Sequence, residues 1–342
     1  MTANIKDVAA LAGVSRTTVS HALNGKGRVS PETLARIQDA ARQLAYTPLP
    51  QAVQLRTQEH HIIGIQFGSV EENSLIPRST FYHALVNSAA SAASAQGWPL
   101  VVVPPRLDGS ALRKLSLDYG VCVDFVGDEA FLQSLSKQPG VIVSNFPHEV
   151  LKRRHPDSCV AILDWENPTW GVLDHLEKSG YHHVAIVGSH DPLPYEREIF
   201  ESVQSWKPAG RTKTSVVRVD ERKRTQTLRQ LITGKGGVDA LWFLTDIDVF
   251  HVLTLARQLG VLIPGDLGLV VGVDVPAYAY VAPSITAIDM SPEIYGARAV
   301  ALLLQLQSEG QGRWVVAPRI PTRLVARRST DRHGVLTEAA DT

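Results

Sequence analysis

The sequence predicts an α/β protein that begins with a small helical head and continues into a much larger region with two parallel sheets. Residues 5–46 place apolar side chains at helical spacing, whereas residues 62–307 alternate short apolar runs with amphipathic stretches. Such alternation is typical of parallel sheets with helices on both faces. The chain has 342 residues, of which 44% are hydrophobic, so it can bury more than one core.

In the larger region the expected strands and helices follow one another in regular order. The runs expected to form strands are Ile62–Phe67, Leu100–Val103, Val121–Val126, Val141–Val143, Val160–Leu163, Val184–Val187, Ser215–Val219, Ala240–Leu244 and Leu267–Val271. The stretches expected to form helices are Phe81–Gln96, Trp170–Lys178, Glu196–Trp206, Thr225–Ile232, Val249–Leu259 and Pro292–Gln307. Near-continuous apolar strands are typical of sheets buried on both faces. Since domains average ~100–150 residues, two doubly wound sheets fit into this region.

The head carries start and stop signals for three short helices. Asn4 is a suitable N-cap for the first helix, and Gly13 allows the tight turn that follows it. Ser15 is a suitable N-cap for the second helix, while Ser30 and Pro31 begin the third. A short helix, a glycine-containing turn and a second helix are the parts of a helix-turn-helix.

The outer side of the second helix carries hydrogen-bonding side chains. The helical period points Val19 inward and leaves four polar side chains outside, those of Arg16, Thr17, Ser20 and His21. Side chains of this kind can read base edges in a major groove. A plain helical bundle with solvated polar residues is the alternative interpretation.

The head resembles the LacI/GalR (lactose-repressor/galactose-repressor) family of bacterial transcription regulators. The matching segments are Asn4-Ile5-Lys6-Asp7-Val8-Ala9, Gly13-Val14-Ser15, Thr18-Val19-Ser20, Leu23-Asn24-Gly25, Val29-Ser30-Pro31-Glu32-Thr33 and Tyr46-Thr47-Pro48. The resemblance continues more weakly in Ile162-Leu163-Asp164, Val184-Ala185-Ile186-Val187-Gly188, Leu244-Thr245-Asp246, Leu259-Gly260-Val261 and Gly272-x-Asp274. It implies a core like a periplasmic sugar-binding protein, with two doubly wound subdomains joined by three crossovers.

This resemblance sets the expected domain boundaries. We expect a helix-turn-helix DNA-binding domain over 1–47, a hinge over 48–59, an effector-binding and dimerisation core over 60–330, and a tail over 331–342. Within the core, the first subdomain is expected to take about 60–162 and 289–318, and the second about 163–288 and 319–330. One short recognition helix buries too little surface for tight specific binding, so we expect a homodimer on a pseudo-palindromic DNA operator.

The expected DNA contacts come from the second helix. Arg16, Thr17 and His21 are expected to read bases, with three further side chains as phosphate or supporting contacts, those of Thr18, Ser20 and Asn24. Up to residue 60, seven basic residues stand against four acidic ones, a local charge of +3 in a chain of net charge zero. This modest excess suits phosphate contacts from one small face.

The segment Pro48–Arg56 is either a plain linker or a hinge helix. In the resembling family it folds on DNA, packs against its twin in the minor groove and inserts a leucine between base pairs. Ala52 and Leu55 fit that pattern, so Leu55 is the expected wedge. Leu49 stands where the family usually has a capping asparagine, which is expected to cost about 1 kcal/mol of hinge-helix stability.

A small-molecule effector is expected in a cleft at the carboxyl ends of the strands. Three acids fall at such strand ends: Asp164, Asp246 and Asp274. Asp246 is the main effector candidate, with capping of the following helix as its alternative role. Asp274 is evenly balanced between an effector contact and a structural one, whereas Asp164 is expected to be structural.

Aromatic and basic side chains near these ends complete the candidate effector site. Trp165 and Trp170 are either a stacking face or part of the core. Ile199 stands where the family usually has an effector-gripping arginine, and Arg197 lies two residues earlier, on another side of the helix. Thr245 replaces the usual asparagine. These departures predict an atypical effector, or a cleft that binds none and a dimer controlled by a protein partner or corepressor.

The sequence also excludes several classes of protein. Only two cysteines occur, Cys122 and Cys159, both in apolar runs, and they are expected to be buried free thiols in a reducing compartment. Without an apolar run of ~20 residues or a secretion segment, we expect a cytoplasmic protein with no membrane contact. Catalytic, phosphate-loop and metal-ligand motifs are absent, so we expect no enzyme activity, cofactor or metal.

Overall fold

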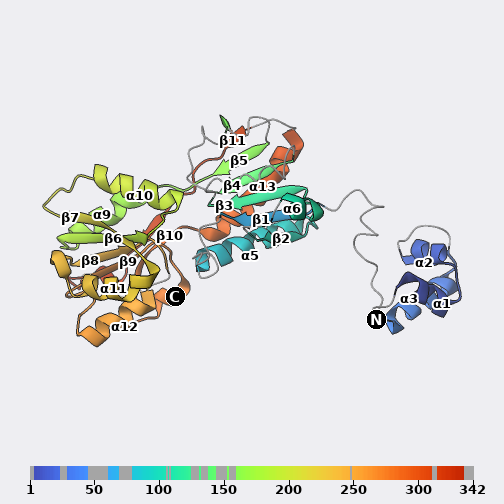
Figure 1. Ribbon diagram of the computed structural model, residues 1–342, viewed down its shortest axis with the longest axis horizontal. Coiled ribbons are helices and arrows are strands. Elements are labelled where there is room, and N and C mark those ends of the chain that lie inside the picture. Colours follow the sequence, from blue (N-terminus) through green and yellow to red (C-terminus); the bar gives the residue numbers. More distant parts are fainter. Residues whose placement is uncertain are drawn as a thin grey trace. The chain divides into compact units, whose positions relative to one another are not determined.

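The computed structural model describes residues 4–23, 29–44, 61–68, 79–104, 107, 109–124, 131, 138–143, 152–153, 159–246, 249–309 and 314–334 (Figure 1). The chain divides into two compact units, Met1–His60 and His61–Thr342. We call the first the head and the second the core. No helix of the described residues is long and apolar enough to cross a membrane.

The head contains the three predicted helices, α1 (Ile5–Ala12), α2 (Arg16–Leu23) and α3 (Pro31–Gln43). The predicted caps are confirmed: the side chain of Asn4 accepts from the amide of Lys6 at 2.8 Å, and Ser15 Oγ accepts from the amide of Thr18 at 3.1 Å. Gly13 ends α1 in the left-handed conformation, at φ 65°.

The three helices of the head share one small apolar core. Val8, Val19 and Ile37, one from each helix, are completely buried. Burying side chains of this size contributes roughly 1.5–3 kcal/mol each, which is enough to fix how the three helices pack.

The core contains two six-stranded sheets. The first has the order β11-β5-β4-β3-β1-β2, and all of its pairs are parallel. Its strands are β1 (Ile63–Phe67), β2 (Leu100–Val103), β3 (Tyr119–Val123), β4 (Gly140–Val143), β5 (Val160–Leu163) and β11 (Trp314–Val316). Its helices are α5 (Thr80–Ala95), α6 (Gly109–Lys114) and α13 (Pro292–Glu309).

The second sheet has the order β12-β10-β9-β8-β6-β7 and is parallel except for the antiparallel pair of β10 and β12. Its strands are β6 (His183–Ser189), β7 (Lys213–Val219), β8 (Ala240–Phe243), β9 (Gly268–Val271), β10 (Thr286–Asp289) and β12 (Arg323–Val325). Its helices are α9 (Thr169–Lys178), α10 (Pro194–Ser205), α11 (Arg224–Ile232) and α12 (Val249–Leu259). The chain passes between the sheets after β5, after β10 and after β11.

The predicted parallel α/β architecture is confirmed, and each predicted strand and helix is present to within a few residues. Among the described strands and α-helices, four short ones were not predicted: β10, β11, β12 and α6. They have three to six residues each, too few for a hydrophobic period to be recognised. The antiparallel edge strand β12 also departs from the purely parallel expectation.

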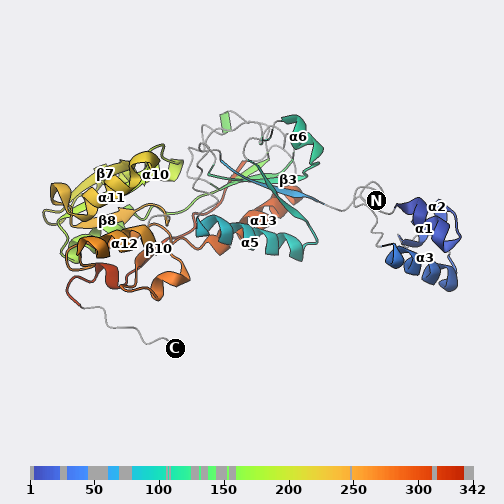
Figure 2. The same ribbon diagram turned by 60° about the horizontal axis from the view of Figure 1, so that its bottom comes forward.

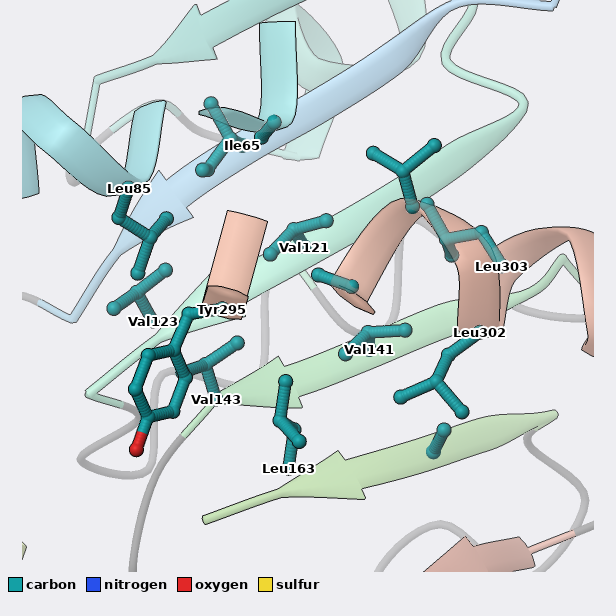
Figure 3. Packing of buried hydrophobic residues seen from close by; sticks show 14 of the residues in the cluster. Ile65, Leu85, Val121, Val123, Val141, Val143, Leu163, Tyr295, Leu302 and Leu303 are labelled. Carbon is teal, nitrogen blue, oxygen red and sulfur yellow. The ribbon is translucent and has the colours of Figure 1, made fainter. Parts of the chain in front are cut away.

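Alternate residues of the first sheet face opposite layers. Val121, Val141 and Leu163 point toward α5 and α13, which lie side by side on one face of the sheet (Figures 2 and 3). The intervening residues Cys122 and Ile142 pack on the other face, where α6 lies. Both cysteines are buried thiols rather than a disulfide, as their apolar surroundings predicted.

Helices α5 and α13 approach each other closely at Gly296. A Cβ atom at this position would lie 2.3 Å from the carbonyl oxygen of Leu85 and 2.4 Å from the amide nitrogen of Ala89. Ser88 Oγ also accepts a hydrogen bond of 3.0 Å from the amide of Ala297. The pair of helices therefore depends on the absence of a side chain at Gly296.

Candidate functional site

The outer face of α2 is the candidate nucleic-acid interface. Arg16, Thr17 and His21 are exposed, while Thr18 and Ser20 are half-buried. Thr17 and His21 lie on the side of α2 opposite Val19, which is completely buried, whereas Arg16, Thr18 and Ser20 lie on the flanks of the helix. The Ser15 cap and the buried Val19 keep α2 in place, so the exposed side chains are not needed for its position.

Thr18 takes part in the cap of α2 as well as facing outward. Its hydroxyl lies 2.8 Å from Ser15 Oγ, which also accepts from the amide of Thr18. This places Thr18 as a supporting residue at the start of the helix. Asn24, Ala52 and Leu55 lie outside the described residues, as does the rest of the expected hinge.

The core contains a cleft that is formed by elements of both sheets. It encloses about 450 Å³ of space when the solvent in its open mouth is included. Its aromatic lining residues are Phe81, Tyr82, Trp165 and Tyr195. Its aliphatic lining residues are Leu193, Leu244, Val273 and Met290. Its polar lining residues are Ser79, Asp124 and Thr245.

The cleft lies where parallel strands end, as expected for open α/β sheets. Asp124 follows β3, Trp165 follows β5, Thr245 follows β8 and Val273 follows β9. Ser79 directly precedes α5, so the first sheet contributes a helix start as well as strand ends.

Asp124 is the most strongly perturbed acid of the cleft. It is 2% exposed and has φ 49°, a left-handed conformation that aspartate tolerates better than most residues. The hydroxyl of Tyr82 donates to its Oδ2. Burial, and to a smaller extent the charge of Glu196, raise the pKa of Asp124 to about 7, against the lowering effect of the Tyr82 hydrogen bond.

Glu196 is a second buried acid near the cleft. It is completely buried in α10, and its two carboxylate oxygens accept from the amides of Ser189 at 2.9 Å and Leu193 at 2.8 Å. Burial raises its pKa, although these amide hydrogen bonds oppose the shift. Glu196 therefore fixes the loop that carries Leu193 and contributes negative charge behind the lining.

Asp246 links the two sheets. Its Oδ2 accepts from the amide of Thr80 at 2.9 Å and from the hydroxyl of Thr80 at 2.5 Å. Thr80 is the first residue of α5, so among the described residues this carboxylate caps a helix of the first sheet and not the helix that follows it. Its Oδ1 is buried and has no hydrogen-bond partner among the described residues.

The other two predicted acids have partners within the protein. Asp274 forms a two-pronged ion pair with Arg327, at 2.7 and 2.8 Å, and both side chains are less than a fifth exposed. Asp164 is buried and lies 3.3 Å from the Nε of Arg319. Each acid directly adjoins a lining residue, Val273 or Trp165, but supports the cleft instead of lining it.

The remaining candidates divide between the cleft and the surface. Trp165 lines the cleft and is 3% exposed, whereas Trp170 is 57% exposed and donates its ring N–H to the carbonyl of Ser202. Arg197 is exposed on α10 and donates its Nε to the carbonyl of Pro192 at 3.0 Å. Ile199 packs in the core of the second sheet. Of the predicted effector residues, only Trp165 lines the cleft.

Sequence reasoning missed Asp124, Glu196, Tyr82 and Tyr195. Asp124 falls inside the expected strand Val121–Val126 and Glu196 at the start of the expected helix Glu196–Trp206, while Tyr195 lies just before that helix. The available signal was an acid at the end of the apolar run Val121-Cys122-Val123. No three His, Cys, Asp or Glu side chains of the described residues come close enough together to hold a metal ion.

Comparison with known proteins agrees with this architecture. Residues 4–49 match the bacterial regulatory proteins of the lacI family, and residues 173–330 match a periplasmic binding protein-like domain. The transcriptional regulator CelR of Thermobifida fusca is 26% identical over 337 residues, which cover 94% of this chain and 96% of CelR. The transcriptional repressor PurR of Haemophilus influenzae is 23% identical over 320 residues, covering 89% of this chain and 90% of PurR.

The fold is also that of solved regulators. The Lac repressor dimer bound to operator and the anti-inducer ONPF has a TM-score of 0.68 at 19% identity, covering 96% of this chain and 99% of that chain. A complex of the regulator CelR with cellobiose has a TM-score of 0.58 at 22% identity, covering 96% and 99%.

Together these features define a DNA-binding transcriptional regulator with a helix-turn-helix head and a two-sheet ligand-binding core. The chain belongs to the LacI family of bacterial regulatory proteins, a family of regulators rather than of enzymes. The resemblance expected from the head is therefore confirmed and extends over the core.

Proposed function

We propose that the protein is a repressor that binds a pseudo-palindromic DNA operator as a homodimer and is released or retained by a small molecule in the cleft. Arg16, Thr17 and His21 read bases, and three residues support or contact phosphates, Thr18, Ser20 and Asn24. The observation that carries this proposal is the exposed polar face of α2 on a capped, packed three-helix head.

The hinge completes the DNA contact in this proposal. Ala52 and Leu55 pack in the minor groove at the centre of the operator, where Leu55 opens a base step. Effector binding shifts the two sheets of the core relative to each other and so changes the position of the paired hinges. Coupling of this kind is typically about 1–3 kcal/mol.

Exposed apolar side chains of the core support the proposed dimer. In the first sheet, the edge strand β2 exposes Val101 by 36% and Val102 by 53%. Among the residues that belong to the second sheet's part of the core, Phe250 of α12 is 54% exposed and Tyr280 is 81% exposed. An edge strand with unpaired backbone groups and apolar side chains favours association with another chain. Two copies of the chain would bury these side chains and place two heads on one duplex.

The dimer is tested by sedimentation of the full chain over a range of concentrations. Val102→Asp combined with Tyr280→Asp is expected to give a monomer at concentrations where the unchanged chain is a dimer. Val316→Asp is the matched control, since Val316 is 57% exposed on β11, at the opposite edge of the first sheet. Equal dimerisation of all three proteins would contradict this interface.

Operator recognition is tested by selecting bound fragments from genomic DNA and measuring affinity for the selected and for random duplexes. Arg16→Ala and His21→Ala are each expected to lose about 1–3 kcal/mol of base discrimination. Arg42→Ala removes an equal charge from α3, where Arg42 pairs with Asp39, and is expected to leave base preference unchanged. Failure to prefer any fragment over random duplex would overturn the proposed function.

A cleft open to solvent favours small-molecule control over control by a protein partner alone. The alternative is the same DNA-binding dimer governed by a protein corepressor. Thermal-shift screening with metabolites distinguishes this alternative from small-molecule control. A ligand at 100 times its Kd stabilises the folded chain by about 2.7 kcal/mol, whereas a degenerate cleft gives no shift with any metabolite.

A further inference from the structure

The lining of the cleft combines aromatic rings with a buried carboxyl group. Phe81, Tyr82, Trp165 and Tyr195 line it together with Asp124, and none of the described lining residues carries a positive charge. Phe81, Tyr82 and Trp165 are each less than 8% exposed, so these rings are fixed parts of the wall.

The rings of the wall form one continuous contact network. Phe81 and Tyr82 lie 5.3 Å apart between ring centroids, and Trp165 and Tyr195 lie 5.7 Å apart. Tyr295 of α13 joins the two pairs, at 5.8 Å from Phe81 and 5.9 Å from Trp165. All four contacts are edge-to-face, so rings from α5, α10, α13 and the end of β5 meet in one cluster.

Three acids give this aromatic cluster a negative environment. Burial raises the pKa of Tyr195 well above its usual range, and the nearby acids Glu196, Asp124 and Asp246 raise it further. The arginine that the family resemblance would place on α10 is replaced by Ile199, which is buried in the core of the second sheet, and Arg197 is exposed. The described part of the cleft therefore offers acceptors and aromatic rings without a cationic donor.

We infer that the cleft binds a small organic cation, an alkylated or primary ammonium compound, whose charge lies among the ring faces and is balanced by Asp124. Ring faces carry negative electrostatic potential, and aromatic cages are the usual protein solution for binding ammonium groups. This inference rests on the proposed function, because it names the chemical class of the small molecule that the same cleft binds.

The chemistry of the lining disfavours the other common effector classes. A carboxylate or phosphate would face Asp124 and Glu196 with no described positive group to pair with it. A sugar needs donors and acceptors spread around its ring, whereas most of the described lining is apolar and its polar residues are Ser79, Thr245 and Asp124, with the polar tips of Tyr82, Trp165 and Tyr195. An ammonium group needs only ring faces and a negative charge.

The charge of Asp124 gives binding a defined pH dependence. The groups that face it are Tyr82 from α5, Glu196 and Tyr195 from α10, and Tyr295 from α13. A cation binds the ionised form of Asp124, so its affinity rises as pH increases from 6 to 8. A quaternary ammonium does not titrate, and the change therefore reports the protein alone.

The test measures binding to the full chain by titration calorimetry with two probes of one shape. Choline carries a trimethylammonium group, and 3,3-dimethylbutan-1-ol replaces its nitrogen with carbon. We expect choline to bind at least tenfold more tightly, and its affinity to rise several-fold between pH 6 and pH 8. Equal affinity for the two probes, or no binding of either, would overturn the inference.

Matched variants locate the charge that is responsible. Asp124→Asn keeps the side-chain shape, and asparagine also tolerates the left-handed backbone of this position. It is expected to weaken choline binding at least tenfold and to abolish its pH dependence. Glu201→Gln removes an exposed acid from α10 and is expected to change neither. If Asp124→Asn does not fold, the pH profile of the unchanged chain still decides.

Failure of this inference is distinguishable from failure of the proposed function. If a neutral sugar or nucleoside shifts operator affinity while choline and its analogue bind equally, the regulator stands and the cation site is wrong. If choline binds as expected but no genomic fragment is preferred, the cation site stands and the operator proposal is wrong.

Discussion

The face of α2 and the cleft of the core are two candidate sites built in opposite ways. The α2 face consists of exposed and half-buried side chains within eight consecutive residues, supported by one local cap and one small core. The cleft is lined from strand ends, loops and a helix start of two sheets, and its polar residues Ser79 and Asp124 are buried. Its side chains contact one another across the two sheets, whereas the α2 face is supported by contacts within the head.

This difference teaches where changes should affect stability. Surface residues away from caps and pairs usually contribute within ±0.5 kcal/mol to the free energy of unfolding, whereas buried pairs and close helix contacts contribute several times more. The following variants test the contrast, from the largest expected loss to the smallest. All six tryptophans lie after residue 61, so tryptophan fluorescence follows the core alone during urea unfolding.

The largest loss is expected for Arg327→Ala. It leaves the carboxylate of Asp274 without its partner in a site less than a fifth exposed, and it also removes a 2.7 Å hydrogen bond to the carbonyl of Ile285. We expect the free energy of unfolding to fall by about 3 kcal/mol. Arg323→Ala is the control, because Arg323 is 76% exposed where it pairs with Asp289, and it should cost under ~1 kcal/mol. Equal losses would contradict the contrast.

A smaller loss is expected for Gly296→Ala. The added Cβ would meet backbone atoms of α5 at 2.3 and 2.4 Å, so α5 and α13 must separate. Overpacking of this kind costs about 2 kcal/mol in urea unfolding. Gly171→Ala in α9 has no atom within 4 Å of the new Cβ and should stabilise the helix slightly. A neutral result at Gly296 would mean that the two helices are not tightly packed.

A pH effect of about 1 kcal/mol is expected from Asp124. Burial raises its pKa to about 7 in the folded chain, above its ordinary value of 3.8, so the folded state holds a proton that the unfolded state has lost. Its contribution to stability is therefore complete below pH 3.8 and is lost as pH rises through 7. The unfolding free energy should be about 1 kcal/mol lower at pH 8 than at pH 6. The Asp124→Asn variant should lack this part of the change. A rise in this component would contradict the assignment.

The smallest effect is expected on the head. Arg16→Ala and Thr17→Ala remove exposed side chains of α2 and should change helix melting, followed by circular dichroism, by less than ~0.5 kcal/mol. Ser15→Ala removes the cap and should cost about 1 kcal/mol. If Arg16→Ala unfolded the head, its loss of DNA binding would no longer identify a contact with bases.

The same contrast governs how much the sequence predicted. The fold class could be predicted because strands and helices leave a repeating pattern of apolar residues in the sequence. The caps of α1, α2 and α3 could be predicted because a helix start is encoded within four residues. The α2 face could be proposed for the same reason. The cleft could not, because Asp124 and Tyr195 are brought together only by the packing of two sheets.

Acids at strand ends show the limit most clearly. Asp164, Asp246 and Asp274 occupy equivalent places in the sequence pattern, and sequence alone favoured Asp246 as the effector contact. Asp274 and Asp164 pair with arginines that lie 53 and 155 residues away in the sequence. Asp246 instead accepts a hydrogen bond from the first residue of a helix of the other sheet. Such distant partners leave no local signal, so their roles are visible only in the folded chain.

The bond between Asp246 and Thr80 has a consequence for any movement of the core. The first amides of a helix usually donate to a capping residue that directly precedes the helix. The first amide of α5 instead donates to the carboxylate of Asp246, 166 residues further along the chain. If the sheets move apart at this point, α5 must find a new acceptor from water or give up its first turn. Opening of the core at this point would therefore expose the amide of Thr80, and amide exchange at Thr80 would time the movement.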